Sequence, residues 1–411
     1  MRKQAFIARA ALLGVAALAL AQPAQAQDCS TLPHPVFVGG SSAVKPVLKA
    51  LGTQLTATAS ITLVYQGSAS CNGITAFTDA TKLKDAASYW DATGAEKSCT
   101  VPLDGQAIDI GLSDVFPATC TSNALPATAK EFSGGPVQAM AFVTGAGSSE
   151  TAISADAAYI ALGFGGTDYR VTPWVDPNFF FIRPDTSGTK KMIATAIGLP
   201  PAKWNKWWTD MTVQGMHILS KSGDLMAAVA ATTNPNATLG ILAADWFDDY
   251  RVLKDGKQIK VLAFQGQTQS CAYYPDSTST AYDKLNVREG RYDMWGQLHI
   301  VARVGNDGLP ASAQISAVVD RLTSKNLSSD DTKTMIDLFT HAHAIPACAM
   351  KVTRTAEIGA PVPSTPDVPC GCYFEKVASG AAQNCTVCLD DNACAGVTGA
   401  PKCRYGFCEA K

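Results

Sequence analysis

The sequence lacks a strong charge of either sign. Its 33 Lys and Arg stand against 35 Asp and Glu. Residues 1–26 hold three of these cations and no carboxylate, so the remainder has 30 against 35, a net charge of about −5. Domains that bind nucleic acid usually present a basic surface. We therefore expect no nucleic-acid partner, and we expect any bound anion to be held by local geometry rather than by the overall field.

The sequence also lacks the common catalytic motifs. It contains no Gly-x-Ser-x-Gly, no His-Glu-x-x-His and no phosphate loop that ends in Gly-Lys-Ser/Thr. His341 and His343 lie two residues apart without a nearby third ligand, so we expect no metal site there. A hydrolase that used one of the Ser-rich turns would need a base, and no Ser has a recognisable partner. We predict a protein that is not an enzyme and that needs no cofactor or metal.

Long apolar runs are absent beyond the N-terminus. Arg2 and Lys3 precede an apolar run over residues 10–20, and Ala24-Gln25-Ala26 follows as a small-x-small cleavage site. No later stretch reaches the ~18 apolar residues of a membrane-spanning helix. The sequence therefore predicts a signal peptide over residues 1–26, no membrane span, and a periplasmic or secreted product.

Cysteine, by contrast, is abundant. All thirteen Cys follow the predicted signal, and seven lie within residues 370–411. In an exported protein this density indicates disulfides rather than zinc. We expect at least one disulfide from Cys71, Cys99 and Cys120, and at least three more within or next to residues 370–411, with Cys348 as a possible partner. Because thirteen is odd, one thiol is free, paired between chains or capped.

Residues 179–189 carry the clearest functional pattern. Residues 179–182 predict a buried strand, and a helix follows from Ser187. Gly188 lets a ligand approach the first turn of that helix, where backbone N–H groups are unpaired and the hydroxyls of Ser187 and Thr189 add donors. Arg183 supplies a forked cation across the turn. This pattern predicts an oxyanion site, and an ordinary capped helix with a surface Arg is the alternative.

Three other predicted strands end in similar turns. The strand at 36–38 leads into Gly39–Pro46, the strand at 61–65 leads into Gln66–Gly73, and the strand at 107–112 ends at Ser113-Asp114. The carboxyl ends of parallel strands meet at one edge of a sheet, where open α/β folds bind ligands. Each turn alone is more typical of a plain loop, but their repetition indicates one site. A cap for the following helix is the other possible role for Asp114.

Together these turns resemble the phosphate-binding proteins that serve bacterial ABC uptake systems, over roughly residues 34–350. Those are type II periplasmic binding proteins. The resemblance therefore implies an α/β fold with two lobes, two crossover strands and the ligand in the cleft between the lobes. The motifs that carry it are Gly40-Ser41-Ser42, Tyr65-Gln66-Gly67-Ser68-Ala69-Ser70, Ser113-Asp114 and Arg183-Pro184-Asp185-Thr186-Ser187-Gly188-Thr189.

The resemblance also implies roles for single residues. From the first lobe, Ser42 and Ser70, together with the adjacent Ser41, would contact the ligand, and Asp114 would accept a proton from it. From the second lobe, the ligand would be held by Arg183, Ser187, Gly188 and Thr189. Asp185 would orient Arg183.

The chain departs from the family pattern in three places. The turn Ser70-Cys71-Asn72-Gly73 is poorer in Ser and Gly than usual, and Ser42 stands where Thr is common. The segment between Cys71 and Asp114 is longer and carries Cys99 and the Tyr89-Trp90 pair. These departures leave the identity of the ligand open.

The expected domain organisation has four parts after the signal. Lobe I comprises 27–142 and 295–350, and lobe II comprises 143–294. A Pro-rich linker over 351–369 leads to a small disulfide-rich C-terminal module over 370–411.

Single elements are also expected within this frame. Residues 135–143 and 291–301 are expected to cross between the lobes, and 311–322 and 330–341 are expected to be amphipathic helices. Trp204, Trp207 and Trp208 are spaced as one face of a helix that packs on the core.

We therefore expect an exported solute-binding protein that captures inorganic phosphate or a related oxyanion for import, with an ABC permease as its implied partner. The alternative is an envelope or secreted adhesion or interaction protein on the same fold, in which the Cys-rich tail has the main role. The tail's own partner is not indicated by the sequence.

Overall fold

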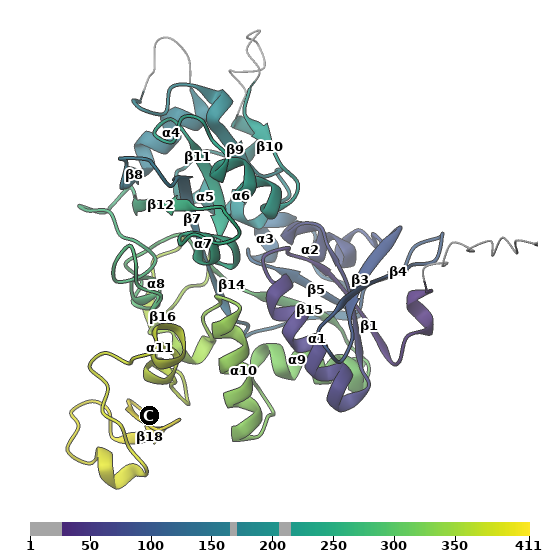
Figure 1. Cartoon of the computed structure of the whole chain (residues 1–411). Coiled ribbons are helices and arrows are strands. Elements are labelled where there is room, and N and C mark those ends of the chain that lie inside the picture. The colour runs from purple at the N-terminus through teal and green to yellow at the C-terminus, as the bar shows by residue number, and fades with distance from the viewer. Residues whose placement is uncertain (1–26, 165–170, 205–214) are drawn as a thin grey trace, which may run out of the picture.

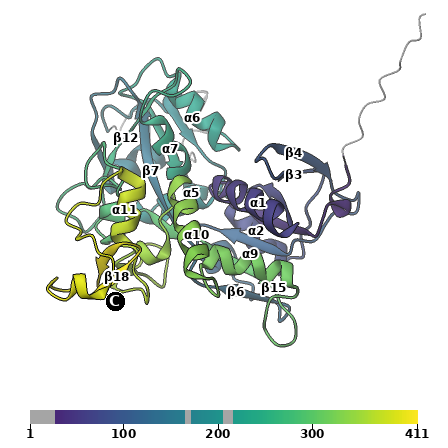
Figure 2. The same cartoon turned by 60° about the horizontal axis from the view of Figure 1, so that its bottom comes forward.

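The computed structural model describes residues 27–164, 171–204 and 215–411. The predicted signal peptide lies outside these residues, as do Trp207 and Trp208 of the expected tryptophan face. The described chain forms two α/β lobes with a small C-terminal region beside the second lobe (Figures 1 and 2). The two-lobed α/β fold class expected from the sequence is confirmed.

Lobe I is built on a mixed sheet with the strand order β4-β3-β2-β1-β5-β15-β6. β1 pairs in parallel with β2 and β5, whereas β15 is antiparallel to both β5 and β6. β3 and β4 form an antiparallel hairpin beside β2. The bounds are β1 (Pro35–Gly40), β2 (Thr62–Gly67), β3 (Ala86–Trp90), β4 (Glu96–Thr100), β5 (Ile110–Ser113), β6 (Ala129–Phe132) and β15 (His299–Arg303).

Helices cover both faces of this sheet. On one face Leu48, Leu51 and Leu55 of α1 join Val318 of α9 and Phe339 of α10 in one apolar cluster, and on the other face α2 packs with its own cluster. The bounds are α1 (Lys45–Ala59), α2 (Ser70–Thr78), α3 (Pro117–Cys120), α9 (Ala313–Thr323) and α10 (Ser329–His341). The two amphipathic helices expected over 311–322 and 330–341 are confirmed.

Lobe II is also built on a mixed sheet, with the strand order β10-β9-β11-β7-β12. β9 is parallel to β10 and β11, and β7 is antiparallel to β11 and β12. The strands are β7 (Val137–Gly145), β8 (Ala152–Ser154), β9 (Phe180–Ile182), β10 (His217–Ile218), β11 (Leu239–Ala243), β12 (Ile259–Val261) and β13 (Ala263–Gln265). The helices are α4 (Ala155–Gly163), α5 (Gly188–Ala196), α6 (Ser222–Ala230), α7 (Ala244–Tyr250) and α8 (Leu285–Arg288).

Two strands cross between the lobes side by side. β7 leaves lobe I, and β14 (Trp295–Gln297) returns antiparallel to it, with Trp295 opposite Ala139 and Gln297 opposite Val137. All nine residues of β7 are buried, as expected for a strand covered on both faces. Both crossing runs predicted from the sequence are confirmed.

The C-terminal region begins against the body of the protein. Cys370 and Phe374 belong to the large apolar cluster that fills lobe II and the hinge, whereas Cys388, Cys394 and Cys408 form a small cluster of their own. The bounds are β16 (Val352–Thr353), β17 (Val362–Pro363), α11 (Gly371–Ser379), β18 (Lys402–Arg404) and β19 (Phe407–Glu409). The first part of this region is therefore docked by apolar packing, and the remainder is held mainly by cross-links.

Six disulfides join twelve of the thirteen cysteines. Their pairs are Cys29–Cys99, Cys71–Cys120, Cys348–Cys370, Cys372–Cys385, Cys388–Cys403 and Cys394–Cys408. The expected bridges around the long 72–113 segment and around the tail are confirmed, including the use of Cys348. Cys271 is the free thiol, and it is exposed.

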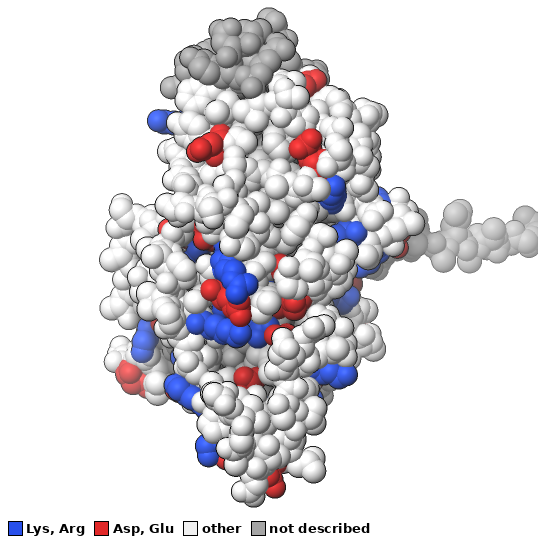
Figure 3. Space-filling model, turned by 90° about the vertical axis from the view of Figure 1, so that its left-hand side faces the viewer, with Lys and Arg blue, Asp and Glu red and all other residues white. Residues whose placement is uncertain are grey.

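Two general features concern the charges on the surface and the length of the helices. Figure 3 shows a face on which acidic and basic side chains intermingle across the middle of the molecule, without an extended patch of one sign. Among the described residues, no helix combines the length and apolar character that crossing a membrane requires.

Candidate functional site

Three elements of lobe I bring hydroxyl and carboxyl groups to one point. Ser41 and Ser42 follow β1, Ser70 is the first residue of α2, and Asp114 follows β5. The backbone at Gly40 has a φ of 120°, and the Ser41 N–H donates to the Leu112 carbonyl at 2.8 Å. A Cβ at Gly40 would lie 2.1 Å from that carbonyl oxygen, so this close turn requires glycine.

Asp114 is the centre of this group. Its side chain is 2% exposed, and its Oδ2 accepts hydrogen bonds from the hydroxyls of Ser41 and Ser70, the latter at 2.9 Å. Its Oδ1 is buried without a hydrogen-bond partner among the described residues. Burial raises the pKa of the Asp114 carboxyl, and the two serine hydroxyls and the charges of His299 and Arg183 oppose the rise. The unpaired oxygen is therefore free to accept a hydrogen bond from a ligand.

Lobe II presents the N-terminus of α5 to the same point. Ser187 is the N-cap residue, and its side chain makes no capping hydrogen bond. A Cβ at Gly188 would lie 2.2 Å from the Ser70 Oγ and 3.3 Å from the Asp114 Cβ, so the first turn packs directly against lobe I. The Cys71 N–H also donates to the Thr186 carbonyl at 3.4 Å across the lobes. The lobes are thus in contact where the sequence predicted a shared site.

Arg183 follows β9 and is 2% exposed. Its guanidinium donates to the Ser222 hydroxyl, to the Ser220 carbonyl at 2.9 Å and to the Ser42 hydroxyl of lobe I at 3.4 Å. Its Nε is buried without a partner among the described residues. Burial lowers the pKa of Arg183, against the opposing effects of Asp245 and Asp114. Arg183 therefore joins the lobes and keeps one donor unused.

The role expected for Asp185 is wrong in this structure. Asp185 accepts a hydrogen bond from Lys190 at 2.6 Å, and its side chain is 57% exposed. Lys190 is buried against the ring of Trp204, with 5.1 Å from its Nζ to the ring centroid. The Asp185 carboxylate thus turns toward the helix, because that buried ammonium needs a counter-charge, and serine groups orient Arg183 instead.

A second buried carboxyl, Asp245, was not expected from the sequence. It lies in the first turn of α7, directly after β11, and is 5% exposed. Neither of its oxygens has a hydrogen-bond partner among the described residues. Burial raises the pKa of Asp245 well above its usual range, and the Asp114 charge adds to the rise while Arg183 opposes it. The feature of the sequence that could have revealed Asp245 is its position just after a predicted strand, because Asp114 occupies the same kind of position at the carboxyl end of a parallel strand.

Two further polar side chains belong to this neighbourhood. The Tyr65 hydroxyl donates to the Ser41 carbonyl at 2.6 Å, and burial raises its pKa. The Gln138 amide on β7 lies near enough to Asp245 to favour its ionised form. Among the described residues, the buried Gln138 amide nitrogen has no partner at hydrogen-bonding distance. Unused polar atoms thus come from both lobes and from a crossing strand.

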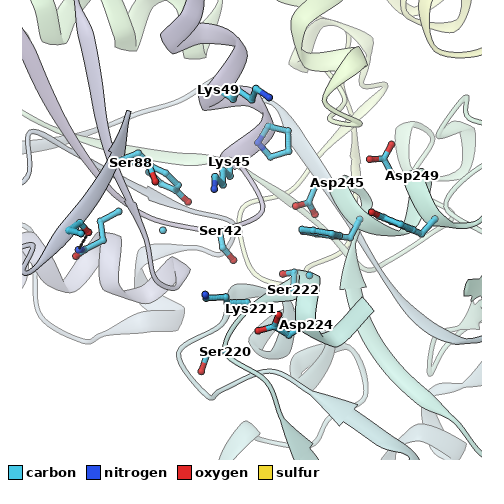
Figure 4. A pocket seen from close by; sticks show the side chains of 18 residues that line it. Ser42, Lys45, Lys49, Ser88, Ser220, Lys221, Ser222, Asp224, Asp245 and Asp249 are labelled. Atoms are coloured by element: carbon cyan, nitrogen blue, oxygen red, sulfur yellow. Dashed lines mark hydrogen bonds between the residues drawn. The ribbon is translucent and has the colours of Figure 1, made fainter. Parts of the chain in front are cut away.

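A cleft of about 760 Å³ opens between the lobes above these groups. Figure 4 shows Ser42 and Lys45 facing Asp245 and Ser222 across it. Its walls also include Lys49 and Tyr65 from lobe I and Lys221, Asp224, Trp246, Asp249 and Tyr250 from lobe II. Of the residues predicted to bind, Ser42 lines this cleft, whereas Asp114 and Arg183 are buried and are not among its lining residues.

The predicted site residues thus fall into two connected sets. Ser41, Ser70, Asp114 and Gly188 are in direct contact, and Arg183 reaches Ser42. Ser187 and Thr189 flank Gly188 at the start of α5, and both are buried. Their part in binding stays a prediction.

Comparisons with known proteins show similarity to solved structures only at low sequence identity. No family model matches the chain, and no curated protein matches it. Among solved structures, it is similar to a putative phosphate ABC transporter substrate-binding protein with bound phosphate from Clostridium perfringens, with 14% identity, a TM-score of 0.47, and coverage of 76% of this chain and 99% of that one.

Two other solved structures show comparable similarity. An ABC-type phosphate transport receptor from Vibrio cholerae has 12% identity, a TM-score of 0.45, and coverage of 76% of this chain and 99% of that one. The Corynebacterium glutamicum OxyR C206 mutant has 10% identity, a TM-score of 0.37, and coverage of 71% and 65%. Such likeness assigns no ligand to this chain, and the two-lobed fold rests on the strand order and crossings described above.

Proposed function

We propose that this protein is an exported solute-binding protein that captures an oxyanion between its lobes for an ABC import system, with a phosphate group as the anion. The observation that carries the proposal is the buried Asp114 carboxyl, which has one oxygen occupied by serine hydroxyls and one oxygen unpaired. Such a group accepts a hydrogen bond from an anion that carries a proton.

The charge of the site favours this class of anion. A carboxylate in a dry cleft repels a fully deprotonated anion, whereas a P–OH group donates to it. Phosphate carries a proton at neutral pH and sulfate does not. Arg183 and the N-terminus of α5, both from lobe II, supply the balancing positive charge and N–H donors. The proposal therefore requires both lobes.

Titration calorimetry with inorganic phosphate tests this proposal. Arg183→Ala should weaken binding by at least about 30-fold, because truncating one partner of a buried charged pair costs about 2–5 kcal/mol. Arg321→Ala is the matched control, since Arg321 lies on α9 of lobe I and donates to the Ala317 carbonyl of its own helix. Equal affinities for the wild type and Arg183→Ala would contradict the proposal, as would no binding by the wild type.

A second candidate function lies in the Cys-rich tail. Val387 and Leu389 are 71% and 98% exposed on the outer part of the tail, and exposed apolar side chains on a cross-linked scaffold suit an interaction surface. In this candidate the protein acts as an envelope or secreted interaction protein. Removal of residues 380–411 with unchanged phosphate affinity would separate the two roles.

A further inference from the structure

The site between the lobes holds more buried carboxyl groups than a bare oxyanion site needs. Asp114 and Asp245 are both buried, and Arg183 is the buried guanidinium whose charge acts on both. Adding inorganic phosphate would place a third negative group among two carboxyls and one cation. A buried carboxyl without donors is costly, so a ligand that brings a donor to it gains affinity.

Asp245 is the carboxyl that the oxyanion site leaves unexplained. Asp114 has two serine partners, whereas neither oxygen of Asp245 has a partner at hydrogen-bonding distance among the described residues. The Gln138 amide and the backbone N–H of Asp245 lie near enough to favour its ionised form, but they do not offset the effect of burial. Asp245 also lines the cleft, and Figure 4 shows it across the opening from Ser42 and Lys45. It is thus a buried acceptor aimed at the space beside the proposed anion position.

The wall around Asp245 suits a cationic group. Trp246 and Tyr250 line the cleft and stack on one another, with ring centroids 5.9 Å apart and an interplanar angle of 13°. An aromatic face beside a buried carboxylate attracts ammonium groups.

The size of the cleft also favours a ligand larger than a bare anion. At about 760 Å³ it lies within the range of about 300–1,000 Å³ that is typical of sites for organic ligands. A bare tetrahedral anion would leave most of it to water. There is therefore room for a substituent that extends from the anion toward lobe II.

We propose that the ligand is a phosphate group with a short organic substituent that ends in an ammonium, and that Asp245 binds this ammonium beside Trp246. This inference rests on the proposed capture of a phosphate group by Arg183 and Asp114. It adds a second subsite, formed by lobe II, that selects the substituent. Asp245 is then a specificity-determining residue.

Calorimetry near pH 5 tests the inference with three compounds: inorganic phosphate, 2-aminoethyl phosphate and propyl phosphate. At this pH a phosphate monoester keeps one P–OH proton for Asp114, because its second pKa is about 6. The last two have nearly the same size, and they differ in an ammonium that replaces a methyl group. The wild type should bind 2-aminoethyl phosphate at least tenfold more tightly than propyl phosphate. Asp245→Asn should remove this preference, because a neutral amide cannot pair with the ammonium.

Asp224→Asn is the matched control, because it removes the same charge from the exposed rim of the same cleft. It should keep the tenfold preference. Equal binding of the two esters by the wild type, or an unchanged preference in Asp245→Asn, would overturn the inference and leave the proposed function standing. If the wild type binds none of the three compounds, the proposed function fails, and the inference fails with it.

Discussion

Asp114 and Asp245 face the same energetic problem at the scale of single residues. Each carboxyl is buried, and burial disfavours its ionised form. Asp114 is partly compensated by Ser41 and Ser70, whereas Asp245 has only the Gln138 amide and its own backbone N–H nearby, neither of them at hydrogen-bonding distance. Protein sites that bind ligands often keep such destabilising groups, because the ligand compensates them.

This cost predicts how stability depends on pH. The folded-state pKa of Asp245 is raised above the unfolded value of about 3.9. Its stabilising contribution is therefore complete below pH 4 and is lost as the pH rises through the raised value. Asp245→Asn should make the ligand-free protein more stable than the wild type at pH 7, and the difference should vanish near pH 4.

Denaturant unfolding between pH 4 and pH 8 measures this effect. Asp224→Asn, at an exposed position, should change the free energy of unfolding by less than about 0.5 kcal/mol at every pH. A less stable Asp245→Asn at pH 7 would contradict the argument, because it would mean that the carboxylate makes stabilising contacts in the folded protein.

Some residues of the site could be identified from the sequence and others could not, for physical reasons. Asp114 and Arg183 could be found because each ends a short apolar strand beside a Ser- or Gly-rich turn. Asp245 also follows a strand, but its neighbours are Ala and Trp, so no turn chemistry marked it. The partner of Asp185 could not be predicted, since a turn carboxylate can reach either Arg183 or Lys190 and burial of Lys190 decides between them.

At the scale of elements, α5 fits closely against lobe I. Gly188 in its first turn has no space for a side chain, since a Cβ would lie 2.2 Å from the Ser70 hydroxyl. That hydroxyl is held by Asp114 at 2.9 Å, and so it cannot move without breaking the bond. The close contact between α5 and lobe I therefore depends on this glycine.

Gly188→Ala should hold the lobes apart. We expect at least a tenfold lower affinity for inorganic phosphate and a larger radius of gyration in small-angle scattering with phosphate present, because the added methyl overpacks the contact. Gly396→Ala is the control, since a Cβ there meets nothing within 4 Å. Wild-type affinity and radius in Gly188→Ala would show that the contact is not part of the bound state.

Element prediction from the sequence succeeded where apolar runs are long or repeated. The two crossing runs and the helices α9 and α10 have such patterns. The hairpin of β3 and β4 was not predicted, because β4 (Glu96–Thr100) is largely exposed and only Cys99 in it is buried. Its place is decided by tertiary contacts, namely the Cys29–Cys99 disulfide and the packing of Trp90 near Tyr65.

At the scale of the whole molecule, an ion pair joins helix α11 of the tail to helix α8 of lobe II. Arg288 is 1% exposed, donates to Glu375 of α11 at 2.7 Å and donates through Nε to the Ala349 carbonyl at 2.9 Å. The Cys348–Cys370 disulfide lies in the same region of the chain. The start of the tail is thus part of the body, a result that seven cysteines in the sequence could not reveal.

Glu375→Gln should destabilise the whole protein. It leaves the buried guanidinium without its counter-charge, at a cost of about 3–5 kcal/mol, which thermal unfolding should detect as a lower Tm. Asp391→Asn breaks the exposed pair with Lys402, whose side chains are 46% and 47% exposed, and should cost less than about 1 kcal/mol. Similar effects of the two variants would contradict the docked arrangement.

The most direct test of the central claim compares phosphate with sulfate in the wild type and in Asp114→Asn, by calorimetry at pH 7. If Asp114 accepts a hydrogen bond from a protonated oxyanion, the wild type should prefer phosphate by about two orders of magnitude or more, because a buried acceptor without its donor loses about 2–5 kcal/mol. Asp114→Asn should narrow that gap. Comparable wild-type affinities for the two anions would contradict the claim, and so would an unchanged preference in Asp114→Asn, which is the result expected if Asp114 serves only as a structural cap.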